Sequence, residues 1–129
     1  METVLDTPFV HLEIKDGIMV GYYKANKTIT LDIAKEIARE RYETFGRLSY
    51  PVLIFDKGVH SIDKAARDFF ASKEGNIGVT AGAVVVKSSF TMMMVNFIFQ
   101  ISRPVIPCKI FTDEEKAIVW LNKYKNSVR

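Results

Sequence analysis

Two short apolar runs, separated by segments with helical spacing, constrain the fold of this chain most strongly. Residues 52–55 are entirely apolar, and residues 79–86 are almost entirely so. Runs of this length and composition are typical of strands buried on both faces of a sheet. Because helical segments separate such runs, their connections are expected to be right-handed crossovers between parallel strands. The sequence therefore predicts an α/β fold with a mostly parallel sheet.

The N-terminal part of the chain predicts a hairpin at the edge of that sheet. Residues 9–14 form one strand-like pattern, and residues 18–23 form a second. Asp16-Gly17 lies between them and is a strong hairpin turn signal. We therefore expect an antiparallel N-terminal hairpin strand beside the parallel ones.

Four helices are expected, because apolar residues recur at helical spacing behind residues that favour an N-cap. The expected N-cap residues are Thr30, Ser61, Ser88 with Ser89, and Thr112. Thr112 also opens a capping box with Glu115, and Gly46 is expected to end the first helix. With a last strand at residues 108–111, the predicted order is ββαβαβαβα, with the helices packed on the sheet.

Composition places the chain among ordinary globular domains. Its 129 residues are 48% hydrophobic and 26% charged, which suits one domain over residues 1–129 with a core at about 9–125 and excludes a disordered chain. The net charge of +3 comes from basic residues interleaved with acidic ones, as at residues 39–41, so nucleic-acid binding is not expected. Cys108 is the lone cysteine, and a chain without an internal disulfide fits the reducing cytoplasm.

The sequence gives little indication of a metal, a cofactor or a membrane span. His11 and His60 are the only histidines and lie on different predicted elements, which argues against a zinc site. Lys57 and Lys87 lie beside helix N-termini, which attract anions, but neither a P-loop nor a G-x-G-x-x-G motif is present, so no cofactor is expected. The longest apolar stretch, residues 90–101, is far shorter than the ~20 residues of a transmembrane helix.

Polar residues follow the predicted strands at the edge where open α/β sheets bind ligands, outside the carboxyl ends of the strands. The candidates for a regulatory or ligand-binding edge are Asp56, His60, Ser61, Asp63 and Ser88. One interpretation is a hydrolase in which His60 takes a serine proton and Asp56 orients the imidazole. The serine would be Ser88 or Ser89. The G-x-S-x-G elbow of such enzymes is absent, and the alternative is that both serines only cap a helix.

The most unusual segment is the third predicted helix, residues 90–101. Asn96, Gln100 and Arg103 leave it only a thin polar stripe, and a helix that is apolar on nearly all sides is usually buried nearly all round. It is therefore a core helix packed on the sheet, a dimer interface, or the wall of a pocket for an apolar ligand. The candidate interface or pocket residues are Phe90, Met92, Met93 and Phe97.

Residues 50–56 and 59–63 resemble the central strand, loop and helix of STAS-type domains, the anti-sigma-factor-antagonist fold and its relatives. The ending from residue 103 to residue 121, with Phe-Thr-Asp-Glu-Glu-Lys-Ala at 111–117, is similar to a family of small uncharacterised bacterial STAS-like or CRAL-TRIO-like proteins. The resemblance covers about residues 9–125. It implies a STAS-like fold for a group without an established activity.

The resemblance also implies a candidate regulatory position. In the anti-sigma antagonists, a partner kinase phosphorylates a serine at the start of the helix after the central strand, and this switches binding to that partner. The aligned position here lies near Lys64, and the nearest serine is Ser61, a few residues earlier. A phosphate on Ser61 would be favourable at a helix N-terminus.

The leading hypothesis is a cytoplasmic, non-enzymatic module that binds a protein partner, with a second copy of the chain as a candidate. It depends on the missing catalytic motifs, the STAS-like resemblance and the methionine-rich and phenylalanine-rich helix. The first alternative, implied by the CRAL-TRIO side of the resemblance, is a carrier of a small apolar molecule. The second is the hydrolase that would use Asp56 and His60.

Overall fold

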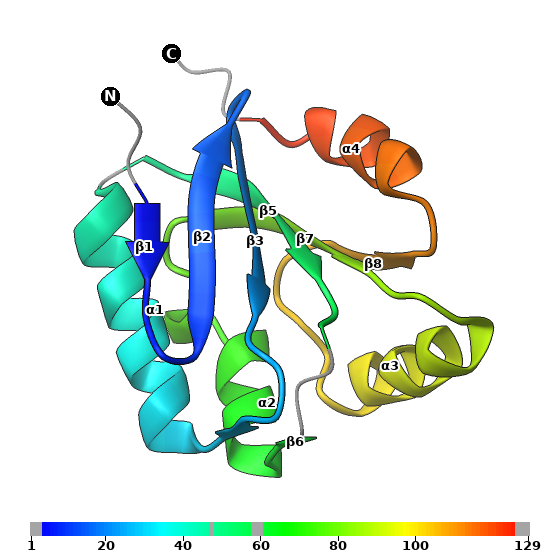
Figure 1. The fold of residues 1–129 in the computed structure, drawn as a ribbon, viewed down its shortest axis with the longest axis horizontal. Helices are drawn as coiled ribbons and strands as arrows, with labels where there is room; N and C mark the ends of the chain where they lie inside the picture. The colour runs from blue at the N-terminus through cyan, green and yellow to red at the C-terminus, as the bar shows by residue number, and fades with distance from the viewer. Residues whose placement is uncertain (1–3, 47, 58–60, 126–129) are drawn as a thin grey trace.

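A computed structural model describes residues 4–46, 48–57 and 61–125. Its centre is a six-stranded sheet with the order β1-β2-β3-β5-β7-β8 (Figure 1). The three N-terminal strands are β1 (Val4–Asp6), β2 (Val10–Lys15) and β3 (Ile18–Tyr23), and β2 is antiparallel to its neighbours β1 and β3. The remaining strands continue parallel to β3, and they are β5 (Tyr50–Phe55), β7 (Val79–Val85) and β8 (Cys108–Phe111).

Helices cover both faces of the sheet. Figure 1 shows α1 (Leu31–Phe45) and α2 (Lys64–Ala71) on one side, and α3 (Ser89–Ile101) and α4 (Glu114–Asn122) on the other. A short 3-10 helix, η1 (Glu74–Asn76), follows α2. Two strands of two residues each, β4 (Thr28–Ile29) and β6 (Ser61–Ile62), form a separate parallel pair.

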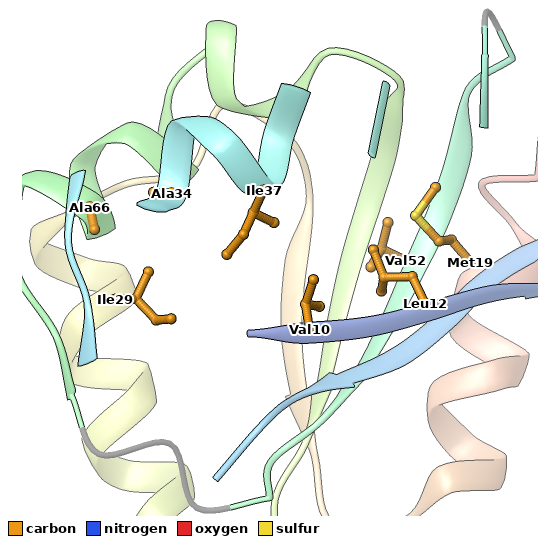
Figure 2. Packing of buried hydrophobic residues seen from close by; sticks show 8 residues of the cluster. All are labelled: Val10, Leu12, Met19, Ile29, Ala34, Ile37, Val52 and Ala66. Carbon is orange, nitrogen blue, oxygen red and sulfur yellow. The ribbon is translucent and has the colours of Figure 1, made fainter. Parts of the chain in front are cut away.

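The sheet separates two hydrophobic cores. The core beneath α1 and α2 contains Val10, Leu12, Met19, Ile29, Ala34, Ile37, Val52 and Ala66 (Figure 2). The core beneath α4 contains Ile18, Leu53, Ala81, Ala83, Phe111, Ala117 and Leu121. Because successive residues of a strand point to opposite faces, Val52 lies in the first core and its neighbour Leu53 in the second. The unbroken apolar run of β5 therefore follows from its central place between two helical layers.

The predicted order ββαβαβαβα is confirmed in the elements β2, β3, α1, β5, α2, β7, α3, β8 and α4. Asp16 and Gly17 have positive φ angles at the turn between β2 and β3, as a tight hairpin requires. Thr30 caps α1, and Gly46 donates its N–H to the Tyr42 carbonyl at the end of that helix. The sequence did not predict β1, β4, β6 or η1, because an element of two or three residues is too short to show a hydrophobic period.

Two predicted helix caps are wrong. Ser61 does not cap α2, because its backbone is in β6 and its N–H donates to the Lys27 carbonyl. Asp63 is the cap instead, and its carboxylate accepts from the Ala66 N–H at 2.9 Å. Asp113 takes the place predicted for Thr112 in the same way, through a bond from the Glu115 N–H. In both cases the competing residue lay one or two positions further along the chain.

The assignment of Asp63 as the cap of α2 leads to a prediction about stability. Asp63→Ala is expected to lower the free energy of unfolding by about 1 kcal/mol, because it leaves an N-terminal amide of α2 without its acceptor. Ser61→Ala is the control, since the exposed Ser61 hydroxyl makes only one long bond, 3.4 Å, to the Thr28 hydroxyl. Urea unfolding of both variants tests the assignment. An equal loss in the two variants would contradict it.

Candidate functional site

The carboxyl ends of β5 and β7 meet at one edge of the sheet, as the predicted site requires. Asp56 follows β5, is partly buried, and donates its backbone N–H to the Val85 carbonyl at the end of β7 (3.0 Å). Lys57 comes next, with its ammonium 5.5 Å from the centre of the Tyr22 ring on β3. His60 lies outside the described residues, so the structure does not place the Asp56–His60 pair of the hydrolase interpretation.

The other candidate residues of this edge have structural tasks. Ser61 pairs with Thr28 in the small β4–β6 sheet, and Asp63 caps α2. The Ser88 hydroxyl accepts from the Thr91 N–H at 3.1 Å and lies 3.0 Å from the Thr91 hydroxyl. The prediction that Ser88 caps the third helix is therefore confirmed.

The helix α3 is held to the rest of the domain near both ends. Just before it, the Val86 N–H donates to the Phe111 carbonyl of β8 at 2.9 Å. Just after it, the buried Ser102 hydroxyl donates to the Asp68 carboxylate of α2 at 2.7 Å. The pKa of Asp68 is lowered first by a hydrogen bond from Lys64 and then by the bond from Ser102. These contacts fix the position of α3 beside β8 and α2.

Between those anchors, α3 presents an uncharged and partly apolar surface. Its sequence, SFTMMMVNFIFQI, contains no charged residue, and none of its described side chains belongs to either core cluster. Met93 is 63% exposed and Ile101 is 56% exposed, and Val105 just beyond the helix is 61% exposed. Asn96, Gln100 and Arg103 are also exposed, as the predicted polar stripe requires.

The four candidate interface residues of α3 are only partly described. Met93 is exposed and Met92 is partly buried, whereas the side chains of Phe90 and Phe97 lie outside the described part. The sequence did not indicate that Ile101 and Val105 are exposed, because the apolar residues of this segment were all expected to share one environment. Pro104 and Pro107 lie just beyond Ile101 and could have indicated that the end of the helix leaves the core.

A second polar cluster, missed from the sequence, surrounds His11 on the N-terminal hairpin. Its ring nitrogens lie 3.2 Å from Asp6 and 3.2 Å from Glu13, and its ring stacks on Tyr22. The signal was the pair of polar residues at positions 11 and 13 of a strand, since a period of two places both on one open face of the sheet. Figure 1 shows β1 at the edge of the sheet with β2 beside it.

The described part of the chain does not bring together groups that could support metal or thiol chemistry. Among the described side chains, no three His, Cys, Asp or Glu residues are placed to hold a metal ion. Burial raises the pKa of the Cys108 thiol to about 11, which keeps it protonated and unreactive near neutral pH. No helix in the described ranges is both long enough and apolar enough to cross a membrane.

Comparison with solved structures identifies the fold. An uncharacterised protein of the DUF3478 family from Shewanella loihica PV-4, whose crystal structure has a SpoIIAA-like fold, superposes with a TM-score of 0.58 at 12% sequence identity. The match covers 94% of this chain and 95% of the other. The α/β architecture is therefore SpoIIAA-like, which is the STAS-like fold that the sequence resemblance implied. At this identity the likeness concerns the fold alone.

Comparison by sequence leads to a family whose function is not known. No curated protein matches the chain. A family model described as a domain of unknown function (DUF7793) matches residues 12–125, from the middle of β2 to the last described residue after α4. That match spans most of the sequence, and the chain belongs to the DUF7793 family.

Proposed function

We propose that this domain is a non-enzymatic protein-interaction module that binds a second copy of itself through α3 and the segment that follows it. The observation that carries the proposal is the exposure of Met93 and Ile101 on the uncharged helix α3, and of Val105 in the segment after it, which also contains the exposed Arg103. Contiguous exposed apolar side chains mark contact sites in soluble domains. Methionine suits such surfaces, because its unbranched side chain adapts to a partner.

The absence of charge from α3 itself favours a second copy as the partner. In a two-fold dimer the same patch meets itself, so any charge at its centre faces a like charge. The α3 sequence contains no such charge, and its exposed Asn96 and Gln100 can each donate and accept hydrogen bonds. The uncharged stretch of α3 can thus pair with a copy of itself through both apolar and polar groups, whereas the exposed Arg103 lies after the helix and outside this stretch.

The size of a stable interface indicates that α3 does not act alone. A dimer of standard size buries about 800 Å² on each partner, which is more than one face of a helix about 20 Å long supplies. The contact would therefore extend to the residues after the helix, including Val105. That segment is held in place by the Val105 N–H, which donates to the Ala71 carbonyl at 2.9 Å.

A role without catalysis is part of the proposal. The sequence lacks the nucleophile elbow of serine hydrolases, and the Ser88 hydroxyl already accepts a hydrogen bond as a helix cap. The SpoIIAA-like fold supports a regulatory role only by analogy, because a fold does not determine function. A cytoplasmic location completes the proposal, supported by the single, protonated Cys108 thiol.

Light scattering after size exclusion tests self-association. The wild-type chain is expected to pass from monomer to dimer with rising concentration, and Ile101→Glu to weaken the dimer at least about tenfold, because it places a carboxylate in an apolar contact. Val119→Glu is the matched control, since Val119 is 65% exposed but belongs to α4, which is not part of the proposed contact segment. Circular dichroism checks that both variants fold.

Two outcomes would contradict this proposal. One is a wild-type chain that stays monomeric up to high micromolar concentrations, and the other is equal weakening by the two glutamate variants. A monomer that carries a bound apolar molecule in native mass spectrometry would support the carrier hypothesis instead.

A further inference from the structure

Both ring nitrogens of His11 face carboxylates. The Nδ1 atom lies 3.2 Å from Oδ1 of Asp6 on the neighbouring strand β1. The Nε2 atom lies 3.2 Å from Oε2 of Glu13, which is on β2 like His11 itself. The ring stacks on Tyr22 of β3, with 5.5 Å between the ring centres and 20° between the planes. The register of the sheet produces this arrangement, because His11 is directly opposite both Asp6 and Tyr22.

Only the protonated imidazole satisfies both contacts. A neutral imidazole has one N–H donor and one nitrogen with a lone pair, whereas the imidazolium ion has two donors. Between two ionised carboxylates, the neutral ring therefore points its lone pair at one of them. Hydrogen bonds from Lys24 and then from His11 lower the pKa of Asp6, so this carboxylate stays ionised while a histidine titrates between pH 5 and 8.

The surroundings indicate which contact is lost with the proton. The Asp6 side chain is 59% exposed and also has Lys24 at 2.7 Å, whereas the Glu13 side chain is 25% exposed. A neutral ring that keeps its proton on Nε2 preserves the bond to the less exposed Glu13. The repulsion then acts at Nδ1, and Asp6 can turn toward water.

We propose that His11 is a proton-dependent clip that fastens the edge strand β1 to the sheet. The protonated ring joins β1 to β2 through Asp6, and loss of the proton as the pH rises releases that contact. The groups that face the clip are Asp6 and Lys24, which pair with each other, Glu13 on β2, and Tyr22 on β3 with Lys57 over its ring. Histidine is the one residue type in this set whose ordinary charge change falls between pH 5 and 8.

The strand β1 is well placed to respond to a small change. It has three residues, β2 is its only partner among the described strands, and it inserts Leu5 at the margin of the core beneath α1 and α2. Loosening β1 exposes the outer backbone edge of β2, and an open edge is where another strand can pair. The clip thus links proton concentration to the exposure of one edge of the sheet.

Amide hydrogen exchange measured by NMR tests the clip. We expect the protection of β1 and of the Thr7 N–H, which donates to the Val10 carbonyl at 2.9 Å, to fall about two- to fivefold as His11 loses its proton, after correction for intrinsic exchange. His11→Gln is expected to abolish this step, because a neutral amide does not titrate. His60→Gln is the control that retains it, since His11 is then the only histidine in the chain.

A second variant separates the clip from a general effect on the hairpin. Asp6→Asn is also expected to remove the change of β1 protection with pH. The introduced amide can donate to a neutral ring as readily as it accepts from a charged one. Protection that does not change with pH in the wild type, or a step that survives in His11→Gln or Asp6→Asn, would overturn the proposal.

Discussion

Gly21→Ala is expected to lower the free energy of unfolding by about 3 kcal/mol, the upper part of the range for overpacked sites. Gly21 is buried on β3, opposite Leu12 of β2 and Ile54 of β5. A Cβ atom at this position would lie 1.9 Å from the His11 carbonyl oxygen and 2.7 Å from Cδ2 of Leu12. The side chain of Leu12 can rotate, but the backbone carbonyl moves only if β2 and β3 separate.

The neighbouring strand β7 supplies a matched control for this substitution. At Gly82 a Cβ atom would meet only Sγ of Cys108, at an ordinary contact distance of 3.5 Å. Gly82→Ala is therefore expected to change stability by less than about 1 kcal/mol, and to increase it if the reduced freedom of the unfolded chain dominates. Thermal unfolding followed by circular dichroism compares the two, and Gly21→Ala should melt about 10 °C lower. Equal melting temperatures would show that β2 can move away at no cost.

The central strands could be predicted because a strand that is buried on both faces needs apolar residues at consecutive positions of the sequence. Residues 52–55 had to be apolar at every position, since Val52 and Ile54 pack in one core and Leu53 and Phe55 in the other. The hairpin turn at Asp16-Gly17 was equally local, because its positive φ angles favour those residue types. Such features depend on neighbours in the sequence and are therefore visible in it.

The candidate site could not be predicted to the same extent, because its features depend on tertiary contacts. Composition indicated that α3 is unusual, but its exposure follows from its place beside β8 and from the anchor between Ser102 and Asp68. The cluster around His11 depends on the register that brings Asp6 opposite it across two strands. Ser61 failed as a cap for a similar reason, since pairing with Thr28 extends the strand-like chain to Ile62.

The buried Arg41 connects α1 to the turn after α2. It is only 9% exposed, and its Nη2 group donates to the Gly75 carbonyl of η1 at 2.8 Å. Burial lowers the pKa of the Arg41 guanidinium, an effect that its interaction with Tyr23 partly offsets, but arginine remains charged in proteins. Burial also raises the pKa of the Tyr23 hydroxyl. The domain thus carries a buried cation whose described hydrogen bond is to a carbonyl oxygen.

Arg41→Ala is expected to lower the free energy of unfolding by about 2–4 kcal/mol, because it removes the donor to the Gly75 carbonyl and leaves a cavity where the side-chain stem packed. Arg41→Met should cost about half as much, since it keeps the apolar stem and relieves the desolvation of a charge. Arg39→Ala is the control on the same helix, where an exposed guanidinium pairs with Glu36 and Glu43, and it should have little effect. Urea unfolding ranks the three variants. Because alanine favours helix at least as well as arginine, a loss in Arg39→Ala equal to that in Arg41→Ala would contradict the importance of the buried contact.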